Sequence, residues 1–472
     1  MSIYDGVNTP SIYVAFESSA PFTQVPEADI YQIATSRGRT SIDQDYGVGT
    51  LTITLNNESG IYDPNFTGTS PYVSGGVSTI KKGQMMFFLM KIDDYYWSQF
   101  FGFLDSVTIN QGVSPVSTFT FTDGLNLLSS SDFPPSFFKR DAETTDDRVF
   151  NALAFAPSFF APVSNLIGSI TNAYGTSSAV TYTCSKNYVV GQTVTITGVN
   201  PSAYNLTDQV ITAVGTGSFT VANSATGAYV SGGVSTIKHV QMQATLGDGT
   251  PIGAIQQAAY CEGIDFYLTT MGLNSEDTGN PATDTAIYES NLPALIFEPI
   301  ANKFNRVTRL AFSDTLDPDF LTYDTIATDD GTYQYVNKAT YEYPNFNSTA
   351  LNQVSAYYGD GDIADDTIYA PVANSYAATN LAVYRARKNA TPTPSVKSLS
   401  FQALGVQQSL YWDLLQLDLQ DQITLSRTAA QTQDYDLVVE GIKHHITPTS
   451  WRVTLTTSAM NPYYTVIDKS GG

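Results

Sequence analysis

The stretch that most constrains the fold runs from Thr50 to Leu55, where threonine alternates strictly with leucine or isoleucine. Alternation with period two predicts a β-strand with one buried face and one wet face. Glycines lie just before this strand and an Asn-Asn-Glu-Ser-Gly stretch follows it, as expected of turns. Pro64 then ends the segment, because proline has no N–H for a ladder hydrogen bond. The chain therefore opens as a β protein, and this stretch contains no catalytic motif.

Further short strands with turns between them are predicted at 12–16, 28–42, 85–90, 100–109 and 116–122. Such a series indicates a small barrel or sandwich over residues 1–125. Residues 126–174 contain a Pro-Pro pair and many serines, which indicates a linker. A helix is predicted within this linker from about Thr145.

Residues 175–240 form a separate unit, with predicted strands at 180–183, 193–196, 210–214 and 218–221. We interpret it as an inserted β-sandwich-like module. The chain resumes with a helix over 252–263, which opens a mixed α+β domain at 241–375 whose clearest strand is 305–310.

The final unit, 376–472, begins with a predicted helix over 376–388 and continues with strands at 417–425, 436–444 and 450–457. The fold class is therefore mainly β with a few helices. We expect two small β-barrel domains at the chain ends, a mixed middle region and the inserted β module.

Two regions resemble minor tail proteins of long-tailed bacteriophages, the tail-tip or baseplate hub proteins. One is RGRTSIDQDYGVGTLTITLNNESGIYDPN from Arg37 to Asn65, and the other comprises LDLQDQITL, DLVVEGIKHHITP and SWRVTLTTS near the chain end. The unit at 175–240 resembles a small β module of marine phage virion proteins. The resemblance implies two related hub-type barrels that alternate around a homotrimer to form a pseudo-sixfold ring.

The same resemblance implies a structural, non-enzymatic virion protein at the tail tip, made in the host cytoplasm and without a cofactor. The implied partners are a distal tail or tail-tube protein, the tape measure protein and distal fibre or tip proteins. The ring would join the tail tube to host-recognition parts and let the tape measure and DNA pass.

The charge balance agrees with passage of DNA without adhesion. The chain has 22 Lys and Arg against 44 Asp and Glu, a net charge of −22. Nucleic-acid surfaces and anionic lipids both attract clustered basic residues, so we expect neither specific nucleic-acid binding nor stable membrane insertion. No run of 18 apolar residues occurs, and the first residues lack a signal-peptide pattern. We expect an acidic or neutral channel wall.

The candidate metal site is an acidic loop containing Asp360, Asp362, Asp365 and Asp366, because alternating carboxylates beside glycine can wrap calcium. The loop lacks the full calcium pattern, so a solvated acidic loop is the favoured interpretation.

Two alternative functions need other residues. A cell-wall hydrolase needs a catalytic domain, yet Cys261 lies in an apolar helix without a nearby histidine, which predicts a core thiol. The pair His444-His445 predicts one buried and one exposed strand position rather than a zinc site. A host-glycan-binding protein would use aromatic residues of the module, such as Tyr204 and Tyr229.

One exact repeat is present: YVSGGVSTIK occupies 72–81 and 229–238, and Gln-Met follows both copies at the same distance. The chain shows no other repeat at this level. The repeat indicates either a copied module end or a hairpin used twice, with Gly-Gly suited to a tight turn. Either way, we expect 175–240 to be peripheral, with its two ends close together.

Overall fold

The structure is a computed structural model, and it confirms the predicted class, mainly β with a few helices. The residues that it describes are 10–17, 22–40, 44–92, 95–130, 143–154, 162–163, 167–186, 188, 192–215, 217–238, 242, 249–270, 277–278, 293–297, 306, 308–315, 320–329, 336–344, 351–358, 363–372, 375–388, 395–406, 408–428 and 433–460.

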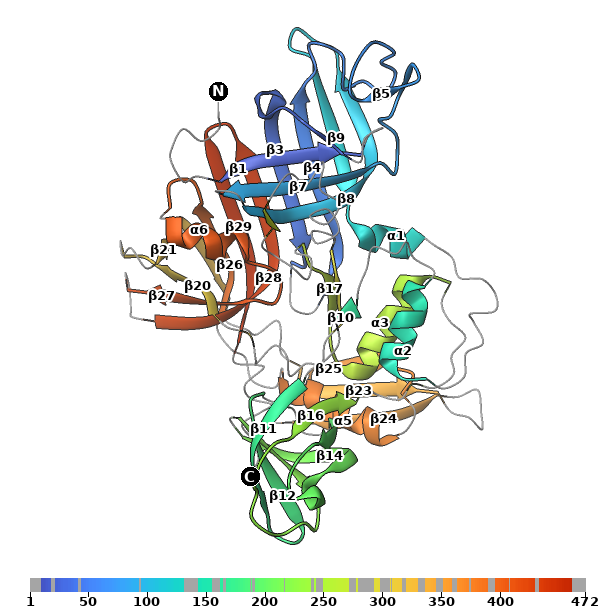
Figure 1. The fold of residues 1–472 in the computed structure, drawn as a ribbon, viewed down its shortest axis with the longest axis vertical. Helices are drawn as coiled ribbons and strands as arrows, with labels where there is room; N and C mark the ends of the chain where they lie inside the picture. Colours follow the sequence, from blue (N-terminus) through green and yellow to red (C-terminus); the bar gives the residue numbers. More distant parts are fainter. Residues whose placement is uncertain are drawn as a thin grey trace.

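The end regions of the chain form two structural repeats within one 15-stranded sheet, and the first repeat consists of six strands from the first part of the chain (Figure 1). Its strands are β1 (Ser11–Phe16), β3 (Ile30–Gly38), β4 (Gly47–Asn56), β7 (Met85–Ile92), β8 (Tyr95–Asn110) and β9 (Val116–Thr122). They lie in the order β1-β7-β8-β9-β4-β3. The alternation seen in the sequence buries Leu51, Ile53 and Leu55 completely.

The second repeat is built from strands near the chain end. These are β20 (Thr308–Ser313), β22 (Thr325–Asp329), β26 (Ser395–Gln402), β27 (Gln422–Arg427), β28 (Gln433–Thr447) and β29 (Ser450–Ala459). They lie in the order β20-β27-β28-β29-β26-β22. When each set is numbered along the chain, both repeats have the spatial order 1-4-5-6-3-2, so the two ends of the chain have one strand topology.

The two repeats also agree in hydrogen bonding at one corner. Gly83 N–H donates to Leu104 O at 2.7 Å, and Leu104 N–H donates to Gln84 O at 2.9 Å. The matching bonds of the second repeat run from Gln420 N–H to Val439 O at 2.7 Å and from Val439 N–H to Asp421 O at 2.9 Å. Gly83 and Gln420 both have positive φ, +85° and +67°.

Each fifth strand carries a bulge at the matching place. In β8 the extra residue is Asp105, between Leu104 and Ser106. In β28 the extra residue is Glu440, between Val439 and Gly441. A bulge bends its strand and frees the following residues to meet another partner.

A short sequence match accompanies the shared strand order of the two repeats. Ile33-Ala34-Thr35 in β3 and Ile326-Ala327-Thr328 in β22 are identical, and their Ile and Ala stand opposite equivalent residues of the third strands. The repeats differ in one pairing: β1 runs antiparallel to β7, whereas β20 runs parallel to β27.

The predicted domain limits differ from this arrangement in two places. β20 and β22 lie in the predicted middle domain, yet they complete the sheet of the final unit. Helix α5 (Ser375–Lys388) was expected in the final unit, yet it contacts β23 (Lys338–Tyr343) and β24 (Asn352–Tyr357). Strand pairing places β20 and β22, and helix packing places α5; sequence periodicity encodes neither.

The inserted module is a closed six-stranded barrel rather than a sandwich. Its strands are β11 (Ile167–Gly175), β12 (Ala179–Cys184), β13 (Thr193–Thr197), β14 (Leu206–Gly215), β15 (Ser218–Ala222) and β16 (Val234–Lys238). The barrel begins at Ile167, before the predicted limit of 175, because β11 pairs with both β12 and β16. Ile167 stands opposite Thr236, so the two ends of the module are neighbours.

The remaining elements connect these parts. Helices α1 (Gly124–Ser130), α2 (Thr145–Leu153) and α3 (Pro251–Glu262) lie between the first repeat and the module, and α6 (Gln408–Leu415) packs on the second repeat (Figure 1). The other strands are β2 (Thr23–Gln24), β5 (Val73–Ser74), β6 (Val77–Ser78), β10 (Pro162–Val163), β17 (Phe266–Leu268), β18 (Asp277–Thr278), β19 (Leu295–Phe297), β21 (Leu321–Thr322) and β25 (Asp365–Tyr369). In the described part of the chain, no helix is long and apolar enough to cross a membrane.

Candidate functional site

The two repeats meet along one strand pair, which we call the seam: β3 of the first repeat against β28 of the second. The pairing is antiparallel, with Gly38 opposite Gly441 and Ile33 opposite Ile446. The seam makes the two end sheets one continuous sheet of the same chain. Gly38 has φ +93°, and a Cβ there would lie 2.3 Å from Glu440 O, so only glycine permits this close approach.

Glu440, the bulge residue of β28, is buried completely behind the seam. Its carboxylate accepts hydrogen bonds from Arg39 Nε at 2.8 Å, Tyr46 Oη at 2.7 Å, Gln420 Nε2 at 2.9 Å and Ser458 Oγ at 2.6 Å. A buried carboxylate is costly unless it is paired and hydrogen-bonded in this way. The four donors come from both repeats, so the charge is compatible with burial only when the seam is closed.

Tyr46 belongs to the same cluster. Its ring lies 4.6 Å below the Arg39 guanidinium carbon, a cation–π contact. Burial raises the pKa of Tyr46 well above its usual value, although the nearby Arg39 acts in the opposite direction. Tyr46 therefore remains a neutral donor to Glu440.

A second ion pair joins Arg37 of β3 to Asp418, at 2.9 Å, with both side chains nearly buried. Asp418 also accepts from the backbone N–H groups of Thr270 at 3.2 Å and Leu419 at 2.8 Å, and from the Thr269 hydroxyl. This carboxylate thus holds the segment after β17 against both repeats.

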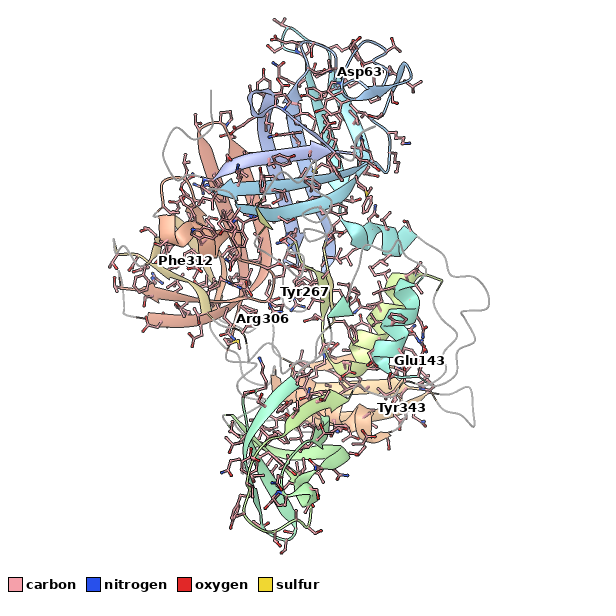
Figure 2. All side chains as sticks on the ribbon, in the orientation of Figure 1. Asp63, Glu143, Tyr267, Arg306, Phe312 and Tyr343 are labelled. Atoms are coloured by element: carbon pink, nitrogen blue, oxygen red, sulfur yellow. The ribbon has the colours of Figure 1, made fainter. Side chains whose placement is uncertain are left out.

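A third group of charges lies beside the seam around Asp421. Its carboxylate is 3.2 Å from Arg306 Nη1 and 3.6 Å from Arg309 Nε. Arg306 also donates to the Tyr267 hydroxyl at 2.5 Å, and both residues are labelled in Figure 2. Burial raises the pKa of Asp421, and Arg306 is the main influence that lowers it. A pocket of about 430 Å³ opens here, lined by Arg306, Thr308, Arg309, Asp413 and Asp421.

The histidine pair has the predicted strand polarity: His444 is buried and His445 is exposed. Trp451 Nε1 donates to His444 Nδ1 at 3.1 Å. Burial lowers the pKa of His444 to about 3, with a smaller contribution from Arg37. The imidazole is therefore a neutral acceptor that positions Trp451, rather than a base.

The candidate calcium residues are only partly described, since Asp360 and Asp362 lie outside the described residues. Asp365 pairs with Lys338 at 2.6 Å, and Asp366 pairs with Arg385. No group of three or more potential metal ligands occurs among the described residues. The calcium site stays a prediction.

Two of the residues considered for the alternative functions lie inside the protein, and the third is half-buried. Cys261 is completely buried, and burial first, then Glu262, raises the pKa of its thiol well above the usual value. Tyr204 is also completely buried, and its hydroxyl donates to Gly227 O at 2.6 Å. The half-buried Tyr229 donates to Ile170 O at 3.1 Å, so these tyrosines hold the barrel together.

The sequence had singled out the stretch that begins at Arg37 and the segment 417–425, but as separate marks of resemblance. The structure brings them together, because Arg37 and Arg39 reach the loop before β27 and the bulge of β28. Glu440 was grouped only with the His444-His445 pair in the sequence, and its buried charge at the seam was not predicted. Its only sequence signal is an acidic residue inside the apolar run of β28.

No family model matches this sequence, and no curated protein matches it in sequence. Solved structures do match in fold. The 43 kDa tail protein of prophage MuSo2 from Shewanella oneidensis has a TM-score of 0.50 and 9% identity, over 96% of this chain and 99% of that one.

Two further solved structures are similar over nearly the whole chain. A tail protein from Neisseria meningitidis MC58 has a TM-score of 0.48 and 8% identity, over 96% of this chain and 99% of that one. The prophage tail protein gp18 from Listeria monocytogenes has a TM-score of 0.43 and 9% identity, over 97% and 99%. The similarity to the Shewanella tail protein confirms the predicted resemblance to phage tail proteins at the level of the fold.

Proposed function

We propose that this chain is a structural virion protein, the hub at the tail tip of a long-tailed phage. Three copies would form a ring in which the first and second repeats alternate. The ring would sit between the tail tube or distal tail protein and the distal fibre or tip proteins, and the tape measure protein and DNA would pass through it.

The observation that carries this proposal is the seam. Two repeats of one topology are joined edge to edge in a single chain, and buried ion pairs hold them in register. A chain with two equivalent units side by side can place six units in a ring from three copies. The excess of acids, with net charge −22, favours a wall that does not bind DNA.

The test is the mass and shape of the purified chain. We expect a trimer by light scattering and a ring with an axial channel by electron microscopy, and antibody labelling at the tail tip of virions. A monomer at high protein concentration, or labelling on the capsid or along the tube shaft, would contradict the proposal. A cell-wall turbidity assay should show no lysis.

A further inference from the structure

The seam covers an edge in the second repeat whose equivalent in the first repeat is open. Beyond its bulge, β28 pairs with β29 on one side and with β3 on the other. Beyond the bulge at Asp105, β8 pairs with β9 on one side, and no described strand covers its other side. Ser106, Thr108 and Asn110 are exposed there. An open edge offers unpaired backbone donors and acceptors to another strand.

A complementary edge is open in the second repeat. β22 stands where β3 stands, next to the third strand and with the same Ile-Ala-Thr sequence. Among the described strands β22 pairs only with β26, and Thr325, Ala327 and Thr328 are exposed. Among the described residues, the fifth strand of the first repeat and the second strand of the second repeat thus each have one open edge.

We infer that these two edges join copies of this chain: β8, from Ser106 to Asn110, pairs antiparallel with β22 of a second copy. The inference rests on the proposed ring and names the contact that closes it. The seam serves as the template for the register of this contact: there, His444 stands opposite Thr35 and His445 opposite Ala34. Aligning the two bulges places Ile109 opposite Thr328 and Asn110 opposite Ala327. Such a head-to-tail contact is heterologous and generates a closed ring when the rotation closes.

Charge at the two edges supports this pairing. Lys81 holds the place of Asp418, since Gln84 N–H donates to Lys81 O at 3.0 Å as Asp421 N–H donates to Asp418 O at 3.2 Å. In sequence, Ser-Arg-Gly follows Thr35 whereas Asp-Asp-Gly follows Thr328. The sequence after Thr328 is thus acidic where the sequence after Thr35 is basic, which is the reverse of the change from Asp418 to Lys81.

A disulfide trap tests the register. Asn110→Cys and Ala327→Cys are introduced together in the full chain, and the assembled protein is oxidised mildly. Residues directly opposite in an antiparallel pair have Cα atoms within disulfide reach, about 4.5 to 5.5 Å apart. We expect covalent dimers and trimers on a non-reducing gel. The wild-type chain is a control, because Cys184 and Cys261 are buried.

The matched control pairs Asn110→Cys with Thr325→Cys, which shifts the partner by two residues on the same exposed side. Diagonal neighbours lie about 7 to 8 Å apart, so this pair should form clearly less disulfide. Two results would overturn the strand pairing and leave the hub proposal intact. One is a trimer of normal mass in which cysteines at 110 and 327 do not link. The other is equal linking of the 110–327 and 110–325 pairs. A monomeric wild-type chain would overturn both.

Amide hydrogen exchange of the wild-type trimer gives an answer that needs no substitution. Pairing with β9 alone protects alternate amides from Ser106 to Asn110, whereas pairing on both edges protects consecutive ones. We expect slow exchange at consecutive residues, and slow exchange from Thr325 to Thr328. Alternating fast and slow amides in the trimer would overturn the inference.

Discussion

Glu440 and Asp105 occupy equivalent bulges in two repeats of the same topology, yet their surroundings are opposite. Glu440 is completely buried and accepts four hydrogen bonds. The side chain of Asp105 is 40% exposed and pairs at 2.9 Å with Lys82, whose side chain is 78% exposed. The strand order of the repeat therefore does not require a buried charge. The neighbouring strand β3, present at one bulge only, makes the difference.

The largest expected effect separates these two acids. Glu440→Ala leaves Arg39 buried without its main partner, which should lower the free energy of unfolding by about 3 to 5 kcal/mol. Asp105→Ala removes an exposed pair and should cost about 0 to 1 kcal/mol. Urea unfolding of both variants measures the contrast. Glu440→Gln, which keeps the size, should fall between them, and equal costs for the two alanine variants would contradict the comparison.

The second contrast concerns the residues just before β27 and β7, the fourth strands of the two repeats. Asp418→Ala removes a nearly buried, hydrogen-bonded ion pair and should cost about 2 to 3 kcal/mol of unfolding free energy. Lys81→Ala, at the equivalent exposed place, should change it by no more than about 0.5 kcal/mol. A double-mutant cycle of Arg37 and Asp418, read by urea unfolding, should show coupling. Independent effects of these two residues would contradict the seam.

Lys81→Glu sharpens the same contrast between copies. This substitution should shift light scattering from trimer toward monomer, most clearly at low salt, because the sequence that follows Thr328 in the proposed partner strand is acidic. Lys91→Glu, on the first repeat but away from this edge, is the matched control. Equal trimer content in the two variants would remove the charge argument.

A smaller expected effect is a difference between the two repeats in how their stability depends on pH. The pKa of His444 is about 3 in the folded protein against 6.5 ordinarily, so its stabilising contribution is present above pH 6.5 and is lost as the pH falls toward 3. Burial raises the pKa of Asp123, which follows β9, to about 7 from 3.8. Its contribution is present below pH 3.8 and is lost as the pH rises toward 7.

Between about pH 4 and 6.5, the contributions of His444 and Asp123 to the free energy of unfolding thus change in opposite directions with pH. Relative to the wild type, His444→Gln should make the stability fall more with rising pH, and Asp123→Asn should make it rise more. Thermal unfolding at several pH values measures this. Slopes that do not change in the two variants would show that these groups keep ordinary pKa values.

The smallest expected effect is removal of the module. Among the described residues its strands pair only with one another, and Ile167 and Thr236 are neighbours at its ends. Replacing residues 167–238 with a short Gly-Ser linker should preserve the trimer mass and shift the main unfolding transition by only a few degrees. Loss of soluble trimer would place the module within the ring.

Much of the strand content could be predicted, because period-two alternation is a local property. Thr50–Leu55 and the final hairpin lie where the pattern placed them. The pairing of β3 with β28 could not be predicted, since the partners are separated by most of the chain. Ile-Ala-Thr is too short to mark a repeat without the register around it.

The exact ten-residue repeat also shows that a local sequence pattern does not predict which segments pair. The first copy forms a hairpin, β5 and β6, whose Tyr72 packs 5.4 Å from Tyr62 in the core of the first repeat. The second copy supplies β16, which closes the module between β11 and β13. Identical residues thus take different partners, because tertiary contacts override local preference. The predicted Gly-Gly turn is correct for the first copy only.

The span between Arg39 and Glu440, 401 residues along the chain, also has a consequence for synthesis. At roughly 5 to 20 residues per second, a ribosome needs about 20 to 80 s to reach Glu440 after Arg39 is made. Until Asp418 and Glu440 are made, the β3 edge of the first repeat is uncovered, and Arg37 and Arg39 lack these two partners. Contacts so distant in sequence form slowly, so the growing chain is most prone to aggregate before β28 emerges.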